Sequence, residues 1–260
     1  MVKRNLKTMI GGIWNIRGTG KPGRKQALAD FIRNHKLEFI GIQETKKMVF
    51  TSQFLNFISG PVDFSWVVLP AKRTAGGILV GFQNGCFEVI NHTCLEYCVV
   101  VTVKNKVDNF IRQLVVVYGT PYLEFKLEFI AELHDVMEQS FVPTLLGGDF
   151  NLVRTASNKS NGVVNANWTM LSNDWINRWS LIDFKLANRS YTWSNNQNIP
   201  IMATLDRVLA ILIGKLNLLS LLLKLWPNLL VTILLYSLIL DVGLLPLPDF
   251  LALKMVARIP

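Results

Sequence analysis

Thr144-Leu145-Leu146-Gly147-Gly148-Asp149-Phe150-Asn151 is the stretch of this 260-residue chain that decides most about its fold. Its first three residues predict a buried strand, and the two glycines let the backbone turn sharply where that strand ends. In a near-extended chain, side chains two residues apart point to the same side, so Asp149 and Asn151 can face one substrate. We expect Asp149 to take a proton from water and Asn151 to hold a phosphate. An Asx-turn with a purely local role is the alternative.

Three further segments place a carboxylate or a carboxamide directly after an apolar run. They are Trp14-Asn15-Ile16-Arg17-Gly18, Ile42-Gln43-Glu44-Thr45-Lys46 and Leu205-Asp206-Arg207. A divalent metal and a phosphate need acidic and amide oxygens that converge at one end of a sheet. Each segment alone is a weak signal, but the four in this order predict one metal-dependent phosphodiesterase site.

The segments that contain Asn15 and Glu44 offer the metal ligands. A divalent cation is hard and prefers oxygen, which makes Glu44 the predicted metal ligand, with Gln43 and Thr45 as further oxygen ligands or hydrogen-bond partners. Taken alone, a glutamate after a strand is usually a surface residue or a cap. Asn15 has a neutral amide that can bond a phosphate oxygen or orient a carboxylate without adding negative charge. A turn residue before Gly18 is the alternative for Asn15.

Two more side chains complete the candidate site. Tyr118 follows an apolar strand at residues 111–117 and can donate a phenolic hydrogen bond to a phosphate. Asp206 can orient a histidine, as carboxylates commonly do for imidazoles.

The charge of the chain is uneven. Hydrophobic residues make up 50% and charged residues 17%, which excludes a disordered chain. Residues 1–60 carry eleven Lys or Arg and three Asp or Glu, so +8 of the net charge of +9 surrounds Asn15 and Glu44. Such a field suits a polyanion such as DNA or RNA. A solvated basic surface is the alternative.

Hydrophobic patterns predict many strands with a few interspersed helices. Strands are expected at residues 8–15, 37–42, 64–69, 77–82, 87–90, 94–103, 111–118, 144–146, 191–194 and 203–209, and helices at 24–35, 125–137 and 167–179. This order indicates an α/β architecture with two sheets rather than a regular βαβ winding.

The three cysteines are Cys86, Cys94 and Cys98, and the first residues of the chain lack the apolar core of a secretory signal. We therefore expect a nuclear or cytoplasmic protein in a reducing compartment, not a secreted one. Cys94 and Cys98 are expected on the same face of one strand, as small core residues.

These motifs resemble the endonuclease/exonuclease/phosphatase superfamily, which includes DNase I-like and apurinic-site endonucleases, and in particular the endonuclease domain of plant LINE-type (non-LTR) retrotransposons. The four segments above, Tyr191-Thr192-Trp193-Ser194-Asn195 and the segments between Leu171 and Asp183 carry the resemblance, which covers about residues 8–209. It implies a DNase I-like four-layer α/β sandwich, with two packed mixed sheets flanked by helices. It also implies Mg²⁺ or Mn²⁺ and the nicking of a DNA strand by in-line attack of water on phosphorus.

The resemblance also implies a role for each candidate residue. Glu44 and Asn15 would bind the metal, Asp149 would align the water, and Asn151 and Tyr118 would hold the phosphate. Arg17, Thr192 and Ser194 would lie near the DNA.

One part of the family pattern is missing. The family ends its site with Ser-Asp-His, whose histidine contacts the scissile phosphate and bonds the carboxylate that matches Asp206. This chain has only His35, His92 and His134, and none follows Asp206. His35 and His134 are expected in outer helices and His92 in a turn. Losing a phosphate-stabilising group commonly costs about 10²–10³ in rate, so we expect weak or no activity.

The composition changes near Ala210. Leucine dominates residues 211–240, whose longest uncharged stretch, 225–240, is sixteen residues and falls short of the roughly 20 that a membrane-spanning helix needs. We expect an incomplete endonuclease-like domain at 1–209 and an aberrant Leu-rich segment at 210–260, for which a frameshift is our hypothesis. Two alternatives stay open: a phosphatase of the same superfamily, and a non-catalytic remnant that attaches to a membrane through the Leu-rich segment.

Overall fold

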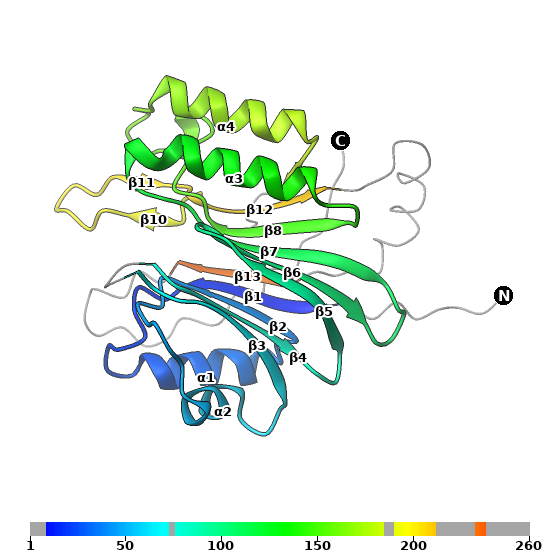
Figure 1. Ribbon diagram of the computed structural model, residues 1–260. Coiled ribbons are helices and arrows are strands. Elements are labelled where there is room, and N and C mark those ends of the chain that lie inside the picture. The colour runs from blue at the N-terminus through cyan, green and yellow to red at the C-terminus, as the bar shows by residue number, and fades with distance from the viewer. Residues whose placement is uncertain (1–8, 73–75, 185–189, 212–231, 238–260) are drawn as a thin grey trace.

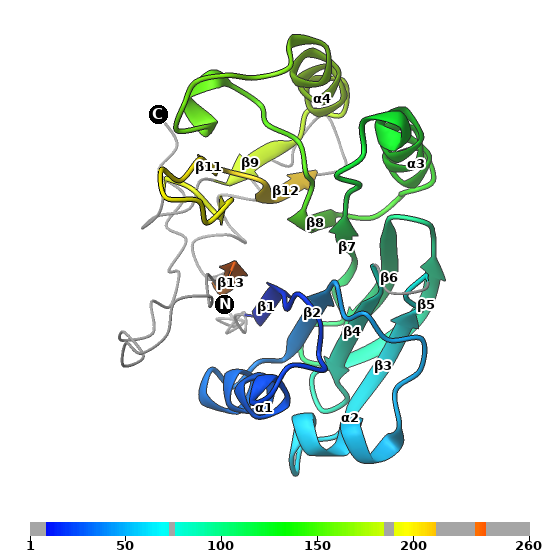
Figure 2. The same ribbon diagram turned by 90° about the vertical axis from the view of Figure 1, so that its left-hand side faces the viewer.

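Two mixed β-sheets pack face to face, and helices cover the outer face of each sheet (Figure 1). The computed structural model describes residues 9–72, 76–184 and 190–211, together with the backbone of the strand at 232–237. The layers follow one another as helices, sheet, sheet and helices (Figure 2). The predicted four-layer α/β sandwich is therefore confirmed.

In the described residues, the first sheet has the strand order β13-β1-β2-β4-β3. The bounds are Ile10–Asn15 (β1), Phe39–Gln43 (β2), Phe64–Leu69 (β3), Ile78–Gln83 (β4) and Thr232–Ser237 (β13). β1 runs parallel to β2 and β13, whereas β4 runs antiparallel to β2 and β3. The helices α1 (Arg24–Asn34) and α2 (Ser52–Ser59) cover the outer face of this sheet.

The second sheet has the order β5-β6-β7-β8-β12-β9. The bounds are Phe87–Cys94 (β5), Cys98–Asn105 (β6), Ile111–Tyr118 (β7), Thr144–Asp149 (β8), Ile182–Phe184 (β9) and Asp206–Ile211 (β12). β7 and β8 are parallel, and the other neighbours are antiparallel.

Two helices and a small hairpin accompany the second sheet. The helices α3 (Lys126–Glu138) and α4 (Ala166–Arg178) lie on its outer face, as Figure 1 shows. The remaining elements are two short 3₁₀ helices and a hairpin, with bounds Leu123–Phe125 (η1), Ala156–Asn158 (η2), Trp193–Ser194 (β10) and Met202–Ala203 (β11).

The sequence of β7 explains why the second sheet is buried on both faces. Leu114 and Val116 belong to the cluster between the sheets, whereas Val115 and Val117 belong to the cluster beneath α3 and α4. Successive side chains of a strand face opposite ways, so an uninterrupted apolar run suits a strand that is covered on both sides.

Gly41 on β2 lies opposite Val116, and a Cβ at Gly41 would come within 2.8 Å of a valine methyl group. Glycine at this position allows the two sheets to approach closely.

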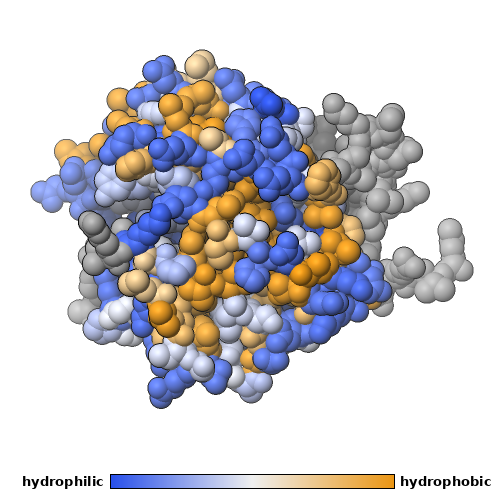
Figure 3. All heavy atoms as spheres, in the orientation of Figure 1, coloured by the Kyte–Doolittle hydropathy of each residue, from blue (hydrophilic) through white to orange (hydrophobic). Residues whose placement is uncertain are grey.

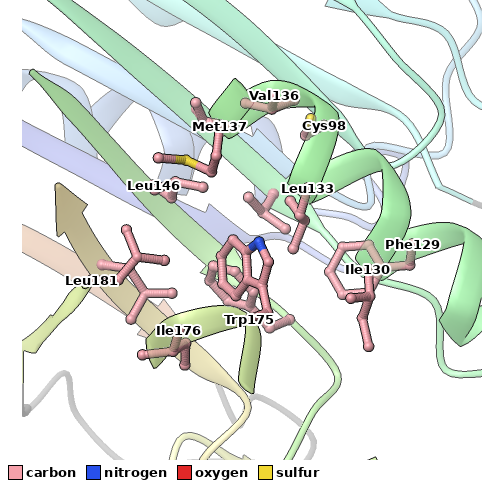
Figure 4. Packing of buried hydrophobic residues seen from close by; sticks show 14 of the residues in the cluster. Cys98, Phe129, Ile130, Leu133, Val136, Met137, Leu146, Trp175, Ile176 and Leu181 are labelled. Carbon is pink, nitrogen blue, oxygen red and sulfur yellow. The ribbon is translucent and has the colours of Figure 1, made fainter. Parts of the chain in front are cut away.

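The helical layer is fixed to β8 by large apolar side chains (Figure 4). Trp175 of α4 packs in one cluster with Phe129 and Leu133 of α3 and with Leu146 of β8. Burial of such a side chain stabilises the fold by about 1.5–3 kcal/mol. The strand that ends at Asp149 is thereby held rigidly against both helices.

The surface is mixed in character. Hydrophobic residues gather in the middle of the face shown in Figure 3, while hydrophilic residues dominate its upper part. Within the described ranges, no helix is long and apolar enough to cross a membrane. The suggested membrane attachment through residues 211–240 falls outside the described residues, except for residue 211 and the backbone of β13.

Most predicted elements are confirmed. The strands at 64–69 and 111–118 have the predicted bounds, α1 ends one residue earlier than predicted, and α3 and α4 are each shifted by one residue at both ends. The sequence patterns do not predict α2 or β9. Both are short, which makes their periodicity hard to recognise.

The prediction of one strand over residues 94–103 is wrong. Cys94 is exposed at the end of β5 and Cys98 is buried at the start of β6, so the two thiols do not share a face. The Leu95 N–H donates to the Cys98 carbonyl and closes a turn between the strands. The Glu132 carboxylate of α3 accepts the N–H groups of Glu96 and Tyr97, the two middle residues of this turn. A distant side chain stabilises this turn, which contains none of the usual turn residues.

Candidate functional site

Five of the sequence-predicted residues lie where strands of both sheets end. Asn15 is the last residue of β1 and is paired in register with Gln43, the last residue of β2. In the second sheet, Tyr118 ends β7, Asp149 ends β8 and Asp206 begins the antiparallel strand β12. Asp149 is paired in register with both Tyr118 and Asp206. The sheet topology alone therefore places three of these side chains at one end of the second sheet.

A hydrogen bond connects the strand ends of the two sheets. Asn15 Nδ2 donates to Asp149 Oδ2 over 3.2 Å, and both side chains are buried. Asn15 Oδ1 accepts the Arg17 N–H over 3.2 Å, which fixes the orientation of the amide. The amide of Asn15 thus orients a carboxylate, which is one of the two roles expected of it.

The turn after β8 has the local hydrogen bond of an Asx-turn and also leaves Asn151 able to bind a ligand. Asp149 Oδ1 accepts the Asn151 N–H over 2.9 Å, as in an Asx-turn. Asn151 has φ +49°, so the near-extended backbone assumed from the sequence is wrong at this residue. Asn151 Nδ2 donates to the Gly119 carbonyl over 2.7 Å. The Asx-turn therefore does not exclude a functional role, because one N–H of the Asn151 amide stays available for a ligand.

Glu44 reaches the same region from the first sheet. It follows β2 with φ +52°, and Arg17, which follows β1, has φ +50°. Such left-handed backbone costs about 1–3 kcal/mol in a non-glycine residue and is common at functional sites.

The pKa of Tyr118 is raised by burial and then by the negative charges of Glu44 and Asp149. The phenol therefore stays protonated and can serve as a hydrogen-bond donor.

The two aspartates of the second sheet are short of compensating positive charge. Burial is the main cause that raises the pKa of Asp149, and the nearby charge of Glu44 adds to it. Burial and then the charge of Asp149 raise the pKa of Asp206. The Arg17 guanidinium opposes both shifts. Glu44, Asp149, Asp206 and Arg17 are therefore electrostatically coupled, as expected for one site.

Gln43 and Thr45 have buried side chains beside Glu44. Gln43 Nε2 donates to the Val117 carbonyl of the opposite sheet, so Gln43 links the sheets rather than facing solvent. A Cβ at Gly148 would collide with Gln43 Nε2. Among the described residues, Gln43 Oε1 and Thr45 Oγ1 have no hydrogen-bond partner. Two buried oxygens beside Glu44 are therefore left as free acceptors.

Thr192 and Ser194 are also buried. Thr192 Oγ1 accepts the N–H groups of Leu205 and Asp206, each over 3.0 Å, and Ser194 Oγ accepts the Asn196 N–H over 3.2 Å. Thr192 thus positions the start of β12, which carries Asp206. The expected place of Thr192 and Ser194 near DNA stays a prediction.

The three histidines of the chain all lie elsewhere. His35 caps the end of α1, and His134 of α3 accepts a hydrogen bond from the indole N–H of Trp179. His92 lies within β5, so the predicted turn is wrong at this residue. β5 is an exposed edge strand with a bulge before residue 91, and its polar residues are tolerated for that reason.

Lys126 is a buried residue of this region that the sequence patterns do not single out. Its Nζ donates to the carbonyls of Thr120 over 3.0 Å and Asn151 over 2.8 Å. The sequence does contain a signal for the burial of Lys126. Phe129 and Ile130 follow it by three and four residues, which places all three side chains on the buried face of α3.

An open groove leads away from the site along the Tyr118 side. Glu44 and Tyr118 line it, together with Lys46, whose Nζ lies 3.0 Å from Glu44 Oε1. The exposed rings of Tyr122 and Phe125 also belong to its lining. The site is therefore accessible to a large ligand.

The residues present fit a magnesium-type ion better than a zinc-type one. In the described part of the chain, no three His, Cys, Asp or Glu side chains form a group that could hold a metal. Mg²⁺ needs fewer protein ligands, because it commonly keeps several waters and uses one or two carboxylates. Glu44 and Asp149 would be such carboxylates, and the Asn15 oxygen, which accepts one N–H from Arg17, has a second lone pair for a metal.

Residues 12–210 match the Endonuclease/Exonuclease/phosphatase family. The chain belongs to this family. No curated protein matches it.

Solved structures of this superfamily share the fold. The chain is similar to the AP endonuclease LMAP from Leishmania major, with TM-score 0.56 and 17% identity over 76% of this chain and 78% of that one. It is also similar to the endonuclease domain of TRAS1, a telomere-specific non-LTR retrotransposon, with TM-score 0.55 and 17% identity over 79% and 85%. The catalytic domain of human Nocturnin gives TM-score 0.53 and 14% identity over 76% and 81%. At such identities the likeness establishes the fold.

Proposed function

We propose that this family member is a metal-dependent phosphodiester hydrolase that nicks DNA with low activity. The observation that carries the proposal is the hydrogen bond of Asn15 to Asp149, which brings oxygen ligands from both sheets together beside Glu44. Mg²⁺ or Mn²⁺, bound through Glu44 and Asn15, would supply positive charge to the phosphate oxygens.

The protein's own side chains have separable tasks in this proposal. Asp149 accepts a proton from the attacking water, and its hydrogen bonds to the Asn15 amide and the Asn151 N–H orient the carboxylate for that task. The free N–H of the Asn151 amide and the protonated phenol of Tyr118 donate to the phosphate. Arg17 adds positive charge on the substrate side of the carboxylates.

Low activity follows from the absent histidine. Asp206 is buried and carries a raised pKa, yet each of the three histidines lies in another part of the fold. Without a histidine to stabilise the phosphate, we expect a rate about 10²–10³ below that of a complete site.

DNA is favoured over a small phosphate ester by the charge of the N-terminal region and by two of the similar structures. Residues 1–60 contribute a net charge of +8, and the charge of Arg17 opposes the rise in the pKa of both Asp149 and Asp206. The groove does not add to this field, because Glu44, Glu96, Glu128 and Glu132 outnumber Lys46 and Lys72 in its lining. The two similar structures are an AP endonuclease and a retrotransposon endonuclease domain, which supports a DNA substrate. A phosphatase is the second candidate, because a mannosyl-6-phosphatase from Bacteroides thetaiotaomicron shares the fold with TM-score 0.53.

We also propose that the chain has a retrotransposon-type origin, that its domain ends near residue 209, and that the reading frame changes beyond that residue. Translation of the other two frames of the gene beyond codon 209 tests the change of reading frame. We expect one of them to contain Ser-Asp-His, and its absence from both would contradict the frame change.

Nicking of supercoiled plasmid DNA with Mg²⁺ tests the function. We expect slow conversion to open circles by the wild-type chain, and a loss of at least tenfold in Glu44→Ala and Asp149→Ala. Glu88→Ala, on the exposed side of β5, is the matched control and should nick like the wild type. Equal nicking by all four proteins would rule out the assigned site. Release of phosphate from a small phosphate monoester, without nicking, would favour the phosphatase.

A further inference from the structure

Three segments meet in a tightly bonded junction behind the candidate site. The Gly119 N–H donates to the Asp149 carbonyl over 2.7 Å, and the Asn151 amide donates to the Gly119 carbonyl over 2.7 Å. The junction thus joins the segment after Tyr118 to the turn after β8. The third segment is the start of α3, which contributes Lys126.

The side chain of Lys126 bonds both of the other segments. Its ammonium donates to Thr120 and Asn151 carbonyls, and the side chain is only 5% exposed. A buried ammonium is costly unless its donors are satisfied, so a lysine at this position must have a strong local reason. Asp149 is the charged group that faces it and favours its charged form, whereas burial lowers the pKa of Lys126.

The backbone conformation of Asn151 explains why a lysine is buried at position 126. Its left-handed backbone, with φ +49°, persists only if the surroundings fix it. Asp149 Oδ1 holds its N–H, Gly119 holds its side-chain amide and Lys126 holds its carbonyl. Every polar group of the backbone of Asn151 is therefore bonded, and Lys126 supplies the only bond to the carbonyl oxygen among the described residues.

We propose that Lys126 is a positioning residue that holds the Asn151 turn and the segment after Tyr118 in the geometry needed to bind a phosphate. The positioning itself rests on contacts within the chain, and its effect on nicking rests on the proposed function. The ammonium acts through Asn151 and does not touch the substrate.

Amide hydrogen exchange tests the positioning directly. In Lys126→Met, which keeps the length of the side chain, we expect the N–H groups of Gly119 and Asn151 to exchange at least tenfold faster than in the wild type. Lys106→Met is the matched control, because Lys106 also donates to a backbone carbonyl but is exposed at the opposite end of the strands. Unchanged exchange at both amides, or equally faster exchange throughout α3 and β8, would overturn the proposal. If Lys126→Met does not fold, the same amides are measured in Lys126→Gln, whose side chain is shorter and uncharged. We expect the same selective rise in exchange at Gly119 and Asn151, and unchanged exchange there would overturn the proposal.

A double-mutant cycle with Asn151→Ala tests the link to function. We expect Lys126→Met to lower the kcat of nicking at least tenfold with KM within about twofold, and to have less than a twofold effect when Asn151 is already alanine. Fully additive losses would show that Lys126 does not act through Asn151. A wild-type chain that does not nick would contradict the proposed function, and amide exchange would still decide the role of Lys126.

Discussion

Asn15 and Asp149 lie 134 positions apart in the chain, and a 3.2 Å hydrogen bond between their side chains joins the ends of β1 and β8. The contact is buried, and the amide that donates it is oriented by the Arg17 N–H. Because β1 and β8 belong to different sheets, this bond sets the distance between the two halves of the candidate site.

Replacement of Asn15 by alanine should weaken both stability and activity. The change leaves a buried oxygen of Asp149 without its donor, which costs about 1–3 kcal/mol of unfolding free energy. Nicking should fall at least tenfold, because the carboxylate is no longer oriented. Urea unfolding and plasmid nicking measure the two effects. Asn34→Ala, at the exposed end of α1, should change neither, and an unfolding free energy of Asn15→Ala equal to that of the wild type contradicts the prediction.

Gly148 should tolerate no side chain. Its backbone has φ +141°, and a Cβ would collide with Gln43 Nε2 and with the Val117 carbonyl. We expect Gly148→Ala to lose about 3 kcal/mol or more, as in other overpacked core positions with an incompatible backbone. Gly20 is the matched control, because a Cβ there meets nothing within 4 Å. Thermal unfolding distinguishes the two variants, and similar melting temperatures would argue against the close approach of Gln43.

Stability without metal should decrease as pH rises. Burial raises the pKa of Asp149 and Asp206, so the native state holds protons that the unfolded chain has already released. Between the unfolded carboxyl pKa of about 3.9 and the raised native values, unfolding releases protons and the unfolding free energy falls. Each unit of raised pKa contributes about 1.4 kcal/mol to that fall.

Asp206→Asn should flatten this dependence, because it removes one of the two buried carboxyl groups. Urea unfolding in the presence of EDTA from pH 4 to pH 8 provides the measurement. Asp174→Asn, an exposed change on α4, should keep the slope of the wild type. Parallel curves for the wild type and Asp206→Asn would mean that Asp206 is not the source of the effect.

Magnesium should stabilise the native state through Glu44. A ligand that binds only the folded protein raises the unfolding free energy by about 2.7 kcal/mol at 100 times its dissociation constant. We expect a rise of the melting temperature with Mg²⁺ concentration in the wild type and in Glu88→Ala, and none in Glu44→Ala. A rise of the same size in Glu44→Ala would place the metal elsewhere.

The sequence predicts the sheets well because buried strands have a simple signature. Leu114 to Val117 of β7 form an uninterrupted apolar run that ends before Tyr118, and the apolar part of β8 ends at Gly147 and Gly148 before Asp149. Tyr118, Asp149 and Asp206 were predictable as a group for the same reason, since they lie at one edge of the second sheet. That Asn15 of the first sheet joins them depends on how the two sheets pack. The α2 helix had signals as well, because Thr51 caps its start and Gly60 ends it.

Other features depend on contacts between distant segments. The turn at residues 95–98 is stabilised by Glu132 of α3, and Lys126 is buried because two loops offer it carbonyl groups. The left-handed backbone of Glu44 has no local signature either, because glutamate rarely adopts it, whereas asparagine, as at Asn151, adopts it more readily. Such features are fixed by tertiary structure, and hydrophobic periodicity carries no information about them.

The strand β13 lies beyond the matched family region and still pairs in parallel with β1, from Ile10 opposite Thr232 to Asn15 opposite Ser237. Ladder bonds use main-chain atoms alone, so many apolar sequences can serve as the neighbour of an edge strand. An imidazole at a reacting phosphate can come only from a histidine codon. A segment that carries no histidine can therefore complete the sheet, so an intact architecture is no measure of catalytic rate.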